Sequence, residues 1–238
     1  MRAISIFDVD RTLTRAPTYS AFLLQSAWRA APWRLGLVPL IAPWALAYAC
    51  KAIPRKRMKE IMHGWTLGRG LTRDAAERLA TRFAETLVER GLYREGHARI
   101  LADRATGRRI ILATAAPALY IDRFAAMLSI GDVVATRCTW RDDRLTHRID
   151  GDNCYGAAKQ RMLEAFLARK GLARGDVHIR FYTDHVSDLP TLDWADEPIA
   201  VNPSRRLREI ATARGWRMLD WREAGDGPAG RAVTAGQH

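Results

Sequence analysis

Two acidic residues stand one residue apart near the start of the chain. Asp8 and Asp10 follow the apolar run at residues 4–7, which predicts a buried strand of a parallel sheet. In open α/β sheets the ligand site lies beyond the carboxyl ends of the strands, so both carboxylates would face one crevice. Such a pair can divide catalysis between attack or cation binding and proton transfer, when its surroundings separate the two pKa values. Taken alone, the pair is more often a solvated turn, because Asp favours turns for local reasons.

Three later segments should bring further polar side chains to the same crevice. Two of them are apolar stretches that predict strands, at residues 109–114 and 177–184. The third is a helical pattern at residues 162–167, preceded by a short loop and a lysine. The polar residues that end or adjoin these segments are Thr114, Lys159, Asp184 and Asp188.

In this order the residues resemble the four motifs of the haloacid dehalogenase (HAD) superfamily, especially its phosphoserine-phosphatase-like branch. The resemblance covers residues 1–14 and about 95–205, and its specificity lies in the joint occurrence of all four motifs. It implies an α/β fold with a Rossmann-like parallel-sheet core and an inserted helical cap of the C1 type. It also implies a phosphomonoester hydrolase that works through an aspartyl-phosphate intermediate.

The resemblance gives each motif residue a role. Asp8 would be the nucleophile, and Asp10 would be the general acid for the leaving alcohol and then the base for water. Thr114 and Lys159 would hold the phosphoryl oxygens. The further substrate-binding residues that we expect are Arg11, Thr12, Ala115 and His185.

A cation is also expected at this site. Phosphoryl transfer spreads negative charge over the equatorial oxygens, and a carboxylate that attacks a phosphate dianion needs this repulsion offset. Lys159 supplies one positive charge, and a hard divalent cation bound by oxygen ligands supplies more. The Mg²⁺ ligands that the resemblance implies are Asp8, the backbone carbonyl of Asp10, Asp184 and, directly or as support, Asp188. His185 is expected to be a neighbour of this ion, because Mg²⁺ prefers oxygen.

Three positions depart from the commonest family pattern. Arg11 stands where many members have Gly, and Thr183 stands where Gly often precedes the last acid. The hydroxyl residue is Thr114, where Ser is also common. None of these changes removes a functional group. Arg11 could add a positive charge beside the phosphate or point to solvent, and both interpretations stay open.

Composition limits the protein class and its surroundings. A chain of 238 residues with 48% hydrophobic residues can bury one core and a small second unit. Its three cysteines form no CxxC pair, which favours a reducing compartment and disfavours a zinc site or a disulfide framework. We expect no signal peptide, because the first strand begins within a few residues of Met1. The core is therefore expected in the cytoplasm.

The net charge of +12 raises the question of a nucleic-acid partner. We predict none, because the excess comes from scattered arginines without an aromatic platform or a nucleic-acid motif. A basic surface could equally serve an anionic membrane or an anionic substrate. The oligomeric state stays undetermined.

The segment between the first aspartates and the second strand is too long for a loop, so it predicts an inserted domain. Its pattern is helical throughout, with helices expected near residues 55–65 and 74–88 and Thr72 as an N-cap. The Gly- and Ala-rich end lacks apolar periodicity and predicts disorder. The predicted boundaries are 1–14 and 92–222 for the catalytic core, 15–91 for the cap, and 223–238 for the tail.

The first half of the predicted cap is cationic and apolar. No carboxylate occurs between Asp10 and Glu60. Residues 35–50, which end at Cys50, carry no charge and have several Trp residues among and around them. This composition indicates membrane contact. The run is shorter than the roughly 20 apolar residues of a spanning helix, so it would lie in the interface or enter as a hairpin. The alternative is a buried cap helix or a dimer surface.

The substrate prediction depends on the same stretch. An anionic head group on an apolar tail would suit a cationic, apolar lid, and the layout resembles that of phosphatidylglycerophosphatase C enzymes. We therefore expect a membrane lipid phosphate such as phosphatidylglycerophosphate, hydrolysed at the cytoplasmic face of the inner membrane. One alternative is a soluble phosphatase acting in the cytoplasm on phosphoserine or another small metabolite. Another is a non-catalytic, regulatory HAD protein.

Overall fold

The computed structural model describes residues 1–68 and 70–222. The tail at 223–238, which the sequence predicts to be disordered, lies outside the described residues.

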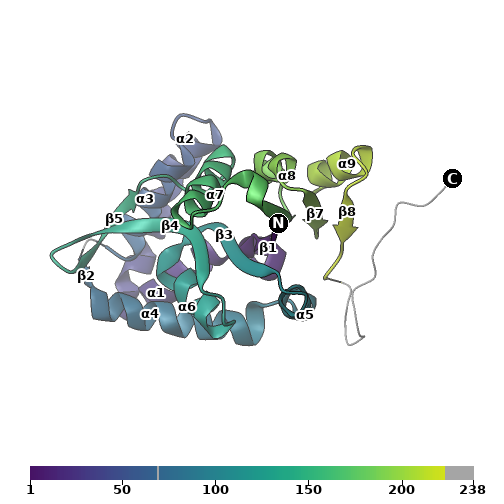
Figure 1. Cartoon of the computed structure of the whole chain (residues 1–238). Helices are drawn as coiled ribbons and strands as arrows, with labels where there is room; N and C mark the ends of the chain where they lie inside the picture. The colour runs from purple at the N-terminus through teal and green to yellow at the C-terminus, as the bar shows by residue number, and fades with distance from the viewer. Residues whose placement is uncertain (69, 223–238) are drawn as a thin grey trace.

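The described strands form one eight-stranded sheet in the order β2-β5-β4-β3-β1-β6-β7-β8 (Figure 1). From β4 to β8 in this order the strands run parallel, and β5 and β2 extend the sheet in the antiparallel sense. The strands are β1 (Arg2–Phe7), β2 (Leu71–Thr72), β3 (Arg109–Pro117), β4 (Asp132–Arg141), β5 (Arg144–Asp150), β6 (Val177–Thr183), β7 (Glu197–Val201) and β8 (Arg217–Leu219). The three strands predicted from the sequence are therefore the central neighbours β3, β1 and β6.

Helices follow the strands and cover both faces of the sheet (Figure 1). They are α1 (Thr18–Ala30), α2 (Ala42–Ala49), α3 (Arg55–Thr66), α4 (Arg73–Thr86), α5 (Arg94–Ala105), α6 (Ala118–Met127), α7 (Ala157–Arg169), α8 (Leu189–Trp194) and α9 (Arg205–Ala213). Short helical turns are η1 (Val9–Leu13), η2 (Pro32–Ile41), η3 (Leu87–Gly91), η4 (Arg174–Asp176) and η5 (Val186–Asp188). This arrangement confirms the predicted α/β, Rossmann-like fold.

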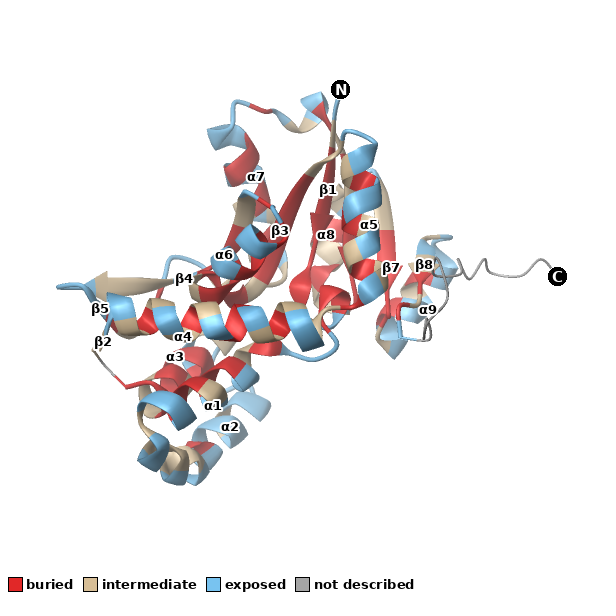
Figure 2. Ribbon diagram, turned by 90° about the horizontal axis from the view of Figure 1, so that it is seen from below, coloured by how far each residue is buried: buried red, intermediate tan, exposed pale blue. Residues whose placement is uncertain are grey.

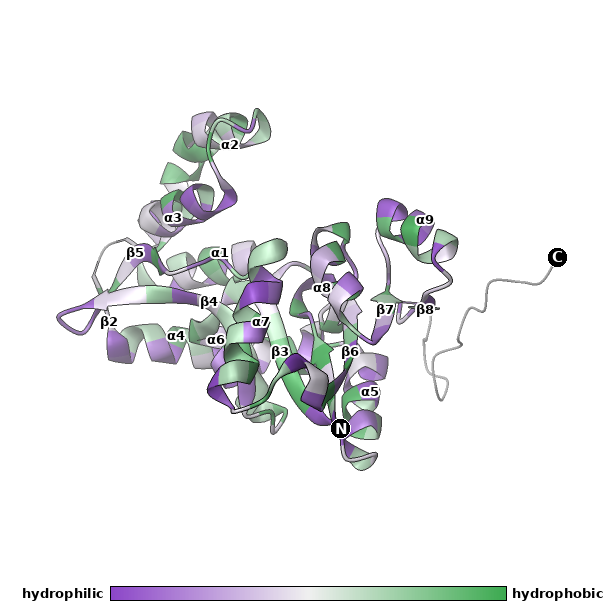
Figure 3. Cartoon of the chain, turned by 45° about the horizontal axis from the view of Figure 1, so that its top comes forward, coloured by the Kyte–Doolittle hydropathy of each residue, from purple (hydrophilic) through white to green (hydrophobic). Residues whose placement is uncertain are grey.

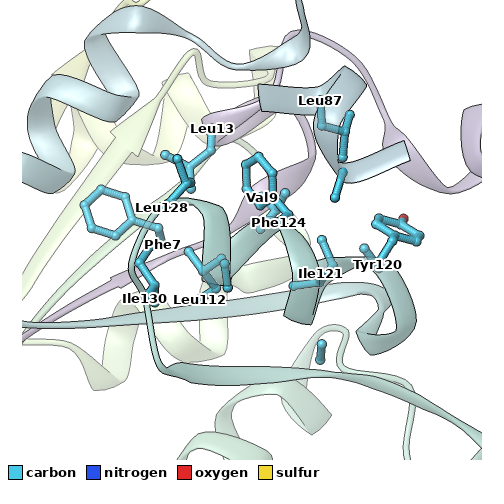
Figure 4. Close-up of a cluster of buried hydrophobic side chains, with 14 of the residues drawn as sticks. Phe7, Val9, Leu13, Leu87, Leu112, Tyr120, Ile121, Phe124, Leu128 and Ile130 are labelled. Carbon is cyan, nitrogen blue, oxygen red and sulfur yellow. The ribbon is translucent and has the colours of Figure 1, made fainter. Parts of the chain in front are cut away.

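The core has two hydrophobic clusters, one on each face of the sheet. Alternate residues of a strand point to opposite faces, so Ile6 and Phe7 of β1 belong to different clusters. Phe7 packs with residues of α5 and α6, a cluster that Figure 4 shows in close-up. Ile6 packs with residues of α7, α8 and α9. The central strands are consequently buried on both sides, as their red ribbons in Figure 2 show.

The insertion between β1 and β3, residues 15–91, shares one of these clusters with the sheet. Phe22 of α1, Phe83 of α4 and Tyr120 of α6 form an aromatic triad whose ring centroids lie 4.7–5.3 Å apart. Aromatic pairs at such separations are favourable beyond the area that they bury. The insertion is therefore fixed to the sheet by a common core.

Within the insertion, the sequence-based predictions are mostly confirmed. Helices α3 and α4 lie where they were expected, and the side chain of Thr72 accepts a hydrogen bond from the amide of Ala75 at 3.4 Å. The prediction of helix throughout is wrong at Leu71–Thr72, which forms β2. The hairpin of β4 and β5 reaches beyond the parallel strands and offers β2 an edge to pair with.

The apolar run at residues 35–50 folds as η2 and α2, at the end of the insertion that is far from the sheet (Figure 3). None of the residues of α2 is buried, so the alternative of a buried cap helix does not hold there. The exposed large apolar side chains of this region are Leu24, Trp28, Trp33, Leu40, Trp44, Leu46 and Tyr48. Among the described residues, no helix combines the length and the hydropathy that crossing a bilayer requires.

Candidate active site

Polar residues at the ends of β1 and β6, and on β3 beside them, come together at one level of the sheet. Phe7 of β1 pairs with Leu112 on one side and with Tyr182 on the other. Asp8 therefore leaves the sheet beside Thr114 and Asp184, which come two residues after those partners. All three line one cavity of about 270 Å³. The order of the strands thus explains why residues distant in sequence form one site.

Most of the predicted site residues line this cavity. Those that do are Asp8, Asp10, Arg11, Thr114, Ala115, Lys159, Asp184, His185 and Asp188. Thr12 is placed differently, because it is fully buried and is not part of the cavity lining. Its hydroxyl donates to Asp8 Oδ2 at 3.3 Å and accepts from the amide of Asp184 at 3.0 Å. Thr12 therefore bridges Asp8 and Asp184 through its hydroxyl.

Lys159 lies between two carboxylates at the bottom of the site. Its Nζ donates to Asp8 Oδ1 at 2.8 Å and to Asp188 Oδ2 at 2.6 Å. Burial alone would lower the pKa of Lys159, but the two carboxylates outweigh it and raise the pKa above its ordinary value. Lys159 is therefore a permanent positive charge. Thr183, the departure from the family pattern, donates its hydroxyl to the same oxygen of Asp188 at 2.7 Å.

Asp10 is held by the first helix of the insertion. Its Oδ1 accepts hydrogen bonds from the amide of Thr18 at 2.8 Å and from the hydroxyl of Thr18 at 2.6 Å. The same hydroxyl lies 2.7 Å from the hydroxyl of Tyr120. These contacts direct the carboxylate of Asp10 in the cavity and leave its second oxygen available to a ligand.

The acids of the site repel one another. Burial, together with Asp188 and Asp10, raises the pKa of Asp8 to about 7 against the opposing effect of Lys159. Burial and the charges of Asp8 and Asp188 raise the pKa of Asp184 to about 8. The single positive charge of Lys159 therefore does not compensate the negative charge of the buried Asp8, Asp184 and Asp188.

The residues fit a divalent cation. Oδ1 of Asp188 is buried and has no hydrogen-bond partner among the described residues, and such an atom calls for an additional ligand. Asp8 and Asp184 add oxygens that a hard cation prefers, and its charge would relieve their repulsion. In the described part of the chain, no group of three or more Asp, Glu, His or Cys side chains is arranged so that it could hold a metal ion. The expected ligand set of Asp8, Asp184, Asp188 and the carbonyl of Asp10 therefore stays a prediction.

Arg11 has an unusual backbone conformation, with φ at +60°. This left-handed region strains residues that carry a Cβ and favours glycine. The conformation explains physically why glycine would suit this position. Arg11 lines the cavity and is also exposed to solvent, so both interpretations of its charge stay open.

Sequence reasoning missed four residues of the cavity lining, which are Pro17, Arg55, Tyr155 and Ser187. Arg55, at the start of α3, lines the cavity, and its guanidinium lies 4.1 Å from the ring centroid of Tyr155. Stacking on an aromatic ring orients a guanidinium without removing its charge. The sequence shows that Arg55 belongs to a run of basic residues in the insertion. It does not show which of these residues faces the cavity.

The family model of haloacid dehalogenase-like hydrolases matches residues 6–193 of this chain. The chain belongs to the haloacid dehalogenase family. Among its relatives, protein CicA of Caulobacter vibrioides is 33% identical over 194 residues, which cover 80% of this chain and 82% of that protein. The inhibition of morphological differentiation protein of Streptomyces azureus is 26% identical over 225 residues, 92% of this chain and 79% of that protein.

Some relatives of this HAD protein are phosphatases by name. A probable phosphatase of Mycobacterium tuberculosis is 30% identical over 122 residues, 51% of this chain and 42% of that protein. The chain thus spans less than half the length of this relative. These findings support the predicted enzyme class, a HAD-type phosphatase.

Solved structures of HAD proteins share the fold. A Bordetella pertussis protein of unknown function superimposes with a TM-score of 0.80 at 28% identity, over 93% of this chain and 99% of that chain. Substrate-bound phosphoserine phosphatase gives a TM-score of 0.60 at 15% identity, over 88% of this chain and 90% of that chain. At this identity, the second likeness shows the fold alone.

Proposed function

We propose that this chain hydrolyses phosphomonoesters through an aspartyl-phosphate on Asp8. The observation that carries the proposal is the position of Asp8 on the cavity wall, with its Oδ1 bound by Lys159 at 2.8 Å and Oδ2 bound by Thr12. Thr114 and Asp10 line the same cavity. Nucleophile, phosphate-binding groups and proton donor are thus within reach of one small ligand.

In the first step, a carboxylate oxygen of Asp8 attacks phosphorus and the bond from phosphorus to the ester oxygen breaks. Asp10 delivers a proton to that oxygen, so the leaving group departs as an alcohol. Lys159 and the hydroxyl of Thr114 stabilise the charge on the equatorial oxygens. Thr18 keeps Asp10 directed at the leaving group.

In the second step, Asp10 accepts a proton from water as the water oxygen attacks phosphorus. The bond between phosphorus and Asp8 then breaks, which releases inorganic phosphate, restores the Asp8 carboxylate and leaves Asp10 protonated for the next cycle. Phosphatases of this family generally use Mg²⁺, and we propose that Asp8, Asp184, Asp188 and the carbonyl of Asp10 would hold it. When bound, the ion would neutralise charge between the acids and the phosphate.

We propose that the insertion acts as a cap that selects the substrate. Its described residues that line the cavity, Pro17 and Arg55, bring one positive charge and no carboxylate. A substrate with an ammonium group, such as phosphoserine, would lack a partner on this side. A small phosphomonoester that carries a second anionic group would find one in Arg55, and the cavity of about 270 Å³ suits such a molecule.

A second candidate substrate is a phosphorylated lipid head group at a membrane surface. The observation that favours it is the set of exposed apolar side chains at residues 24–48, of which Trp33 and Leu46 are 65% and 66% exposed. Aromatic residues next to Arg and Lys are typical of segments that lie in the interface of an anionic membrane.

Phosphate release tests both candidates in one assay. The substrates are phosphoserine, 3-phosphoglycerate, which carries a carboxylate but no ammonium group, and phosphatidylglycerophosphate in mixed micelles. We expect Mg²⁺-dependent turnover of 3-phosphoglycerate above that of phosphoserine. Preference for the lipid would select the second candidate, and preference for phosphoserine would contradict the proposal that the cap has no partner for an ammonium group.

Three variant proteins complete these experiments. Asp8→Asn should abolish turnover of every substrate, and equal activity in the variant and the wild type would overturn the mechanism. Trp33→Ser with Leu46→Ser should reduce pelleting with anionic vesicles if the exposed segment binds membranes. Leu101→Ser, which removes an exposed leucine on α5, is the matched control for that measurement.

A further inference from the structure

One positively charged side chain of the insertion is buried against the loops of the sheet. Lys59 of α3 is only 6% exposed. Its Nζ donates to the carbonyl oxygen of Ala115 at 2.5 Å and to Asn153 Oδ1 at 2.9 Å. Ala115 directly follows Thr114, so a residue of the insertion binds the segment that carries the phosphate-binding hydroxyl.

The peptide unit between Ala115 and Ala116 connects Lys59 to that hydroxyl. Its carbonyl oxygen accepts from Lys59, and its N–H donates to Thr114 Oγ1 at 3.1 Å. Because a peptide unit is planar and rigid, fixing one end fixes the direction of the other. A hydroxyl that accepts through its lone pair keeps its own proton to donate. Thr114 is thereby prepared to donate into the cavity.

Other contacts hold Lys59 in this position. The hydroxyl of Tyr19 donates to the backbone carbonyl of Lys59 at 2.8 Å, and the Nζ of Lys59 lies 5.1 Å from the ring centroid of Tyr19. On the other side, Asn153 Oδ1 also accepts from the hydroxyl of Thr136 at 3.0 Å. The lysine therefore connects α1 and α3 of the insertion to β3, β4 and the loop before α7.

We propose that Lys59 is a positioning residue, which fixes the Ala115–Ala116 peptide from the insertion and through it directs the hydroxyl of Thr114 at the phosphoryl group. The inference rests on the proposed phosphatase function. According to this proposal, the insertion does more than cover the substrate. Its packing against the sheet also completes the phosphate-binding site.

The burial of this lysine carries an energetic cost. Burial and the nearby charge of Arg55 lower the pKa of Lys59 to about 8, although Asp10 and two cysteine thiols act in the opposite direction. A lowered pKa means that the folded protein stabilises the ammonium less well than water does. An apolar residue of similar length would avoid this cost, but it would leave the carbonyl of Ala115 and Oδ1 of Asn153 without this donor, so the stability of each variant must be measured.

A double-mutant cycle tests the proposal. The variants are Lys59→Met, Thr114→Val and their combination, and the measurements are kcat/KM on the best small phosphomonoester and calorimetric binding of orthovanadate with Mg²⁺. Lys59→Met should lower both quantities by about 10-fold, a fraction of the loss typical for an oxyanion-binding donor. In the Thr114→Val background it should change them by less than about 2-fold, because the group it directs is gone.

Lys56→Met is the matched control on the same helix. Lys56 donates to the carbonyl of Gly151 at 2.6 Å, outside the cavity lining, so its removal should leave both quantities unchanged. Lys59→Gln retains a donor and should recover part of the loss, and thermal unfolding of every variant checks folding. The proposal is wrong if Lys59→Met acts equally in both backgrounds, or no more strongly than Lys56→Met. If the wild type binds orthovanadate but hydrolyses no ester, the proposed function is wrong. The double-mutant cycle can then still be evaluated from the orthovanadate affinities alone, so the role of Lys59 is tested separately.

Discussion

Asp10 and Thr18 are joined by two hydrogen bonds to one carboxylate oxygen, from the amide at 2.8 Å and from the hydroxyl at 2.6 Å. Asp10 comes from the end of β1, whereas Thr18 begins the first helix of the insertion. The proposed acid and base of the reaction is therefore oriented by the insertion, which we propose to cover the substrate.

Thr18→Val should slow catalysis without abolishing it. The variant removes the hydroxyl and keeps the amide, so Asp10 loses one of two contacts, and we expect kcat to fall by about 10-fold, less than the usual loss of a general acid. The fall should be largest for alkyl phosphates and small for p-nitrophenyl phosphate, whose leaving group needs no proton. Thr18→Ser, which retains the hydroxyl, should behave as the wild type. An equal loss for both kinds of ester would contradict the orienting role.

Arg11→Gly should separate backbone strain from charge. Relief of the left-handed conformation, about 1–2 kcal/mol, should exceed the added freedom of the unfolded chain, about 0.4–1 kcal/mol. Urea unfolding should therefore show a gain of up to about 1 kcal/mol, while KM for the phosphomonoester rises. Arg11→Lys keeps a positive charge and should keep KM nearer to that of the wild type. An unchanged KM in Arg11→Gly would mean that Arg11 points to solvent.

Asp188→Asn should weaken Mg²⁺ binding. Whether Asp188 holds the ion or supports it, loss of its charge should raise the half-saturating Mg²⁺ concentration by about 10-fold or more. The increase in Tm that Mg²⁺ gives should shrink as well, which is a readout independent of activity. Asp193→Asn on α8 changes a half-exposed acid outside the cavity lining and is the control. Equal Mg²⁺ titrations of the wild type and Asp188→Asn would exclude both roles.

His63 should make the fold sensitive to acid. Burial, with a smaller effect of His147, lowers the pKa of His63 from 6.5 to about 4. Between these values the unfolded chain binds the proton and the folded protein does not, so stability is full above about pH 6.5 and is lost as the pH falls toward 4. The loss should approach about 1.4 kcal/mol per pH unit.

The measurement is urea unfolding of the wild type and His63→Leu at pH 7 and pH 5. The wild type should lose about 2 kcal/mol more than the variant between these two conditions, since the variant lacks the titrating ring. A parallel decline of both proteins would show that other groups cause the acid sensitivity.

The sequence alone predicted which residues meet at the candidate active site, because its signals are local. Asp8, Thr114 and Asp184 each end an apolar stretch, and adjacent parallel strands present their carboxyl ends at one edge. The pairing of β1 with both β3 and β6 confirms this. Helical periodicity likewise located α3 and α4.

Tertiary structure alone decided what the insertion brings to that centre. Lys59 and Ala115 are 56 residues apart, and which cation of a basic run is buried depends on how α3 packs against the sheet. The same packing brings Arg55 rather than its neighbours to the cavity and leaves α2 without a buried residue. Periodicity shows that a helix has an apolar and a polar face, but it does not show what each face packs against. The whole fold sets these partners, because one structure must bury the apolar side chains and also pair the buried charges and hydrogen-bonding groups.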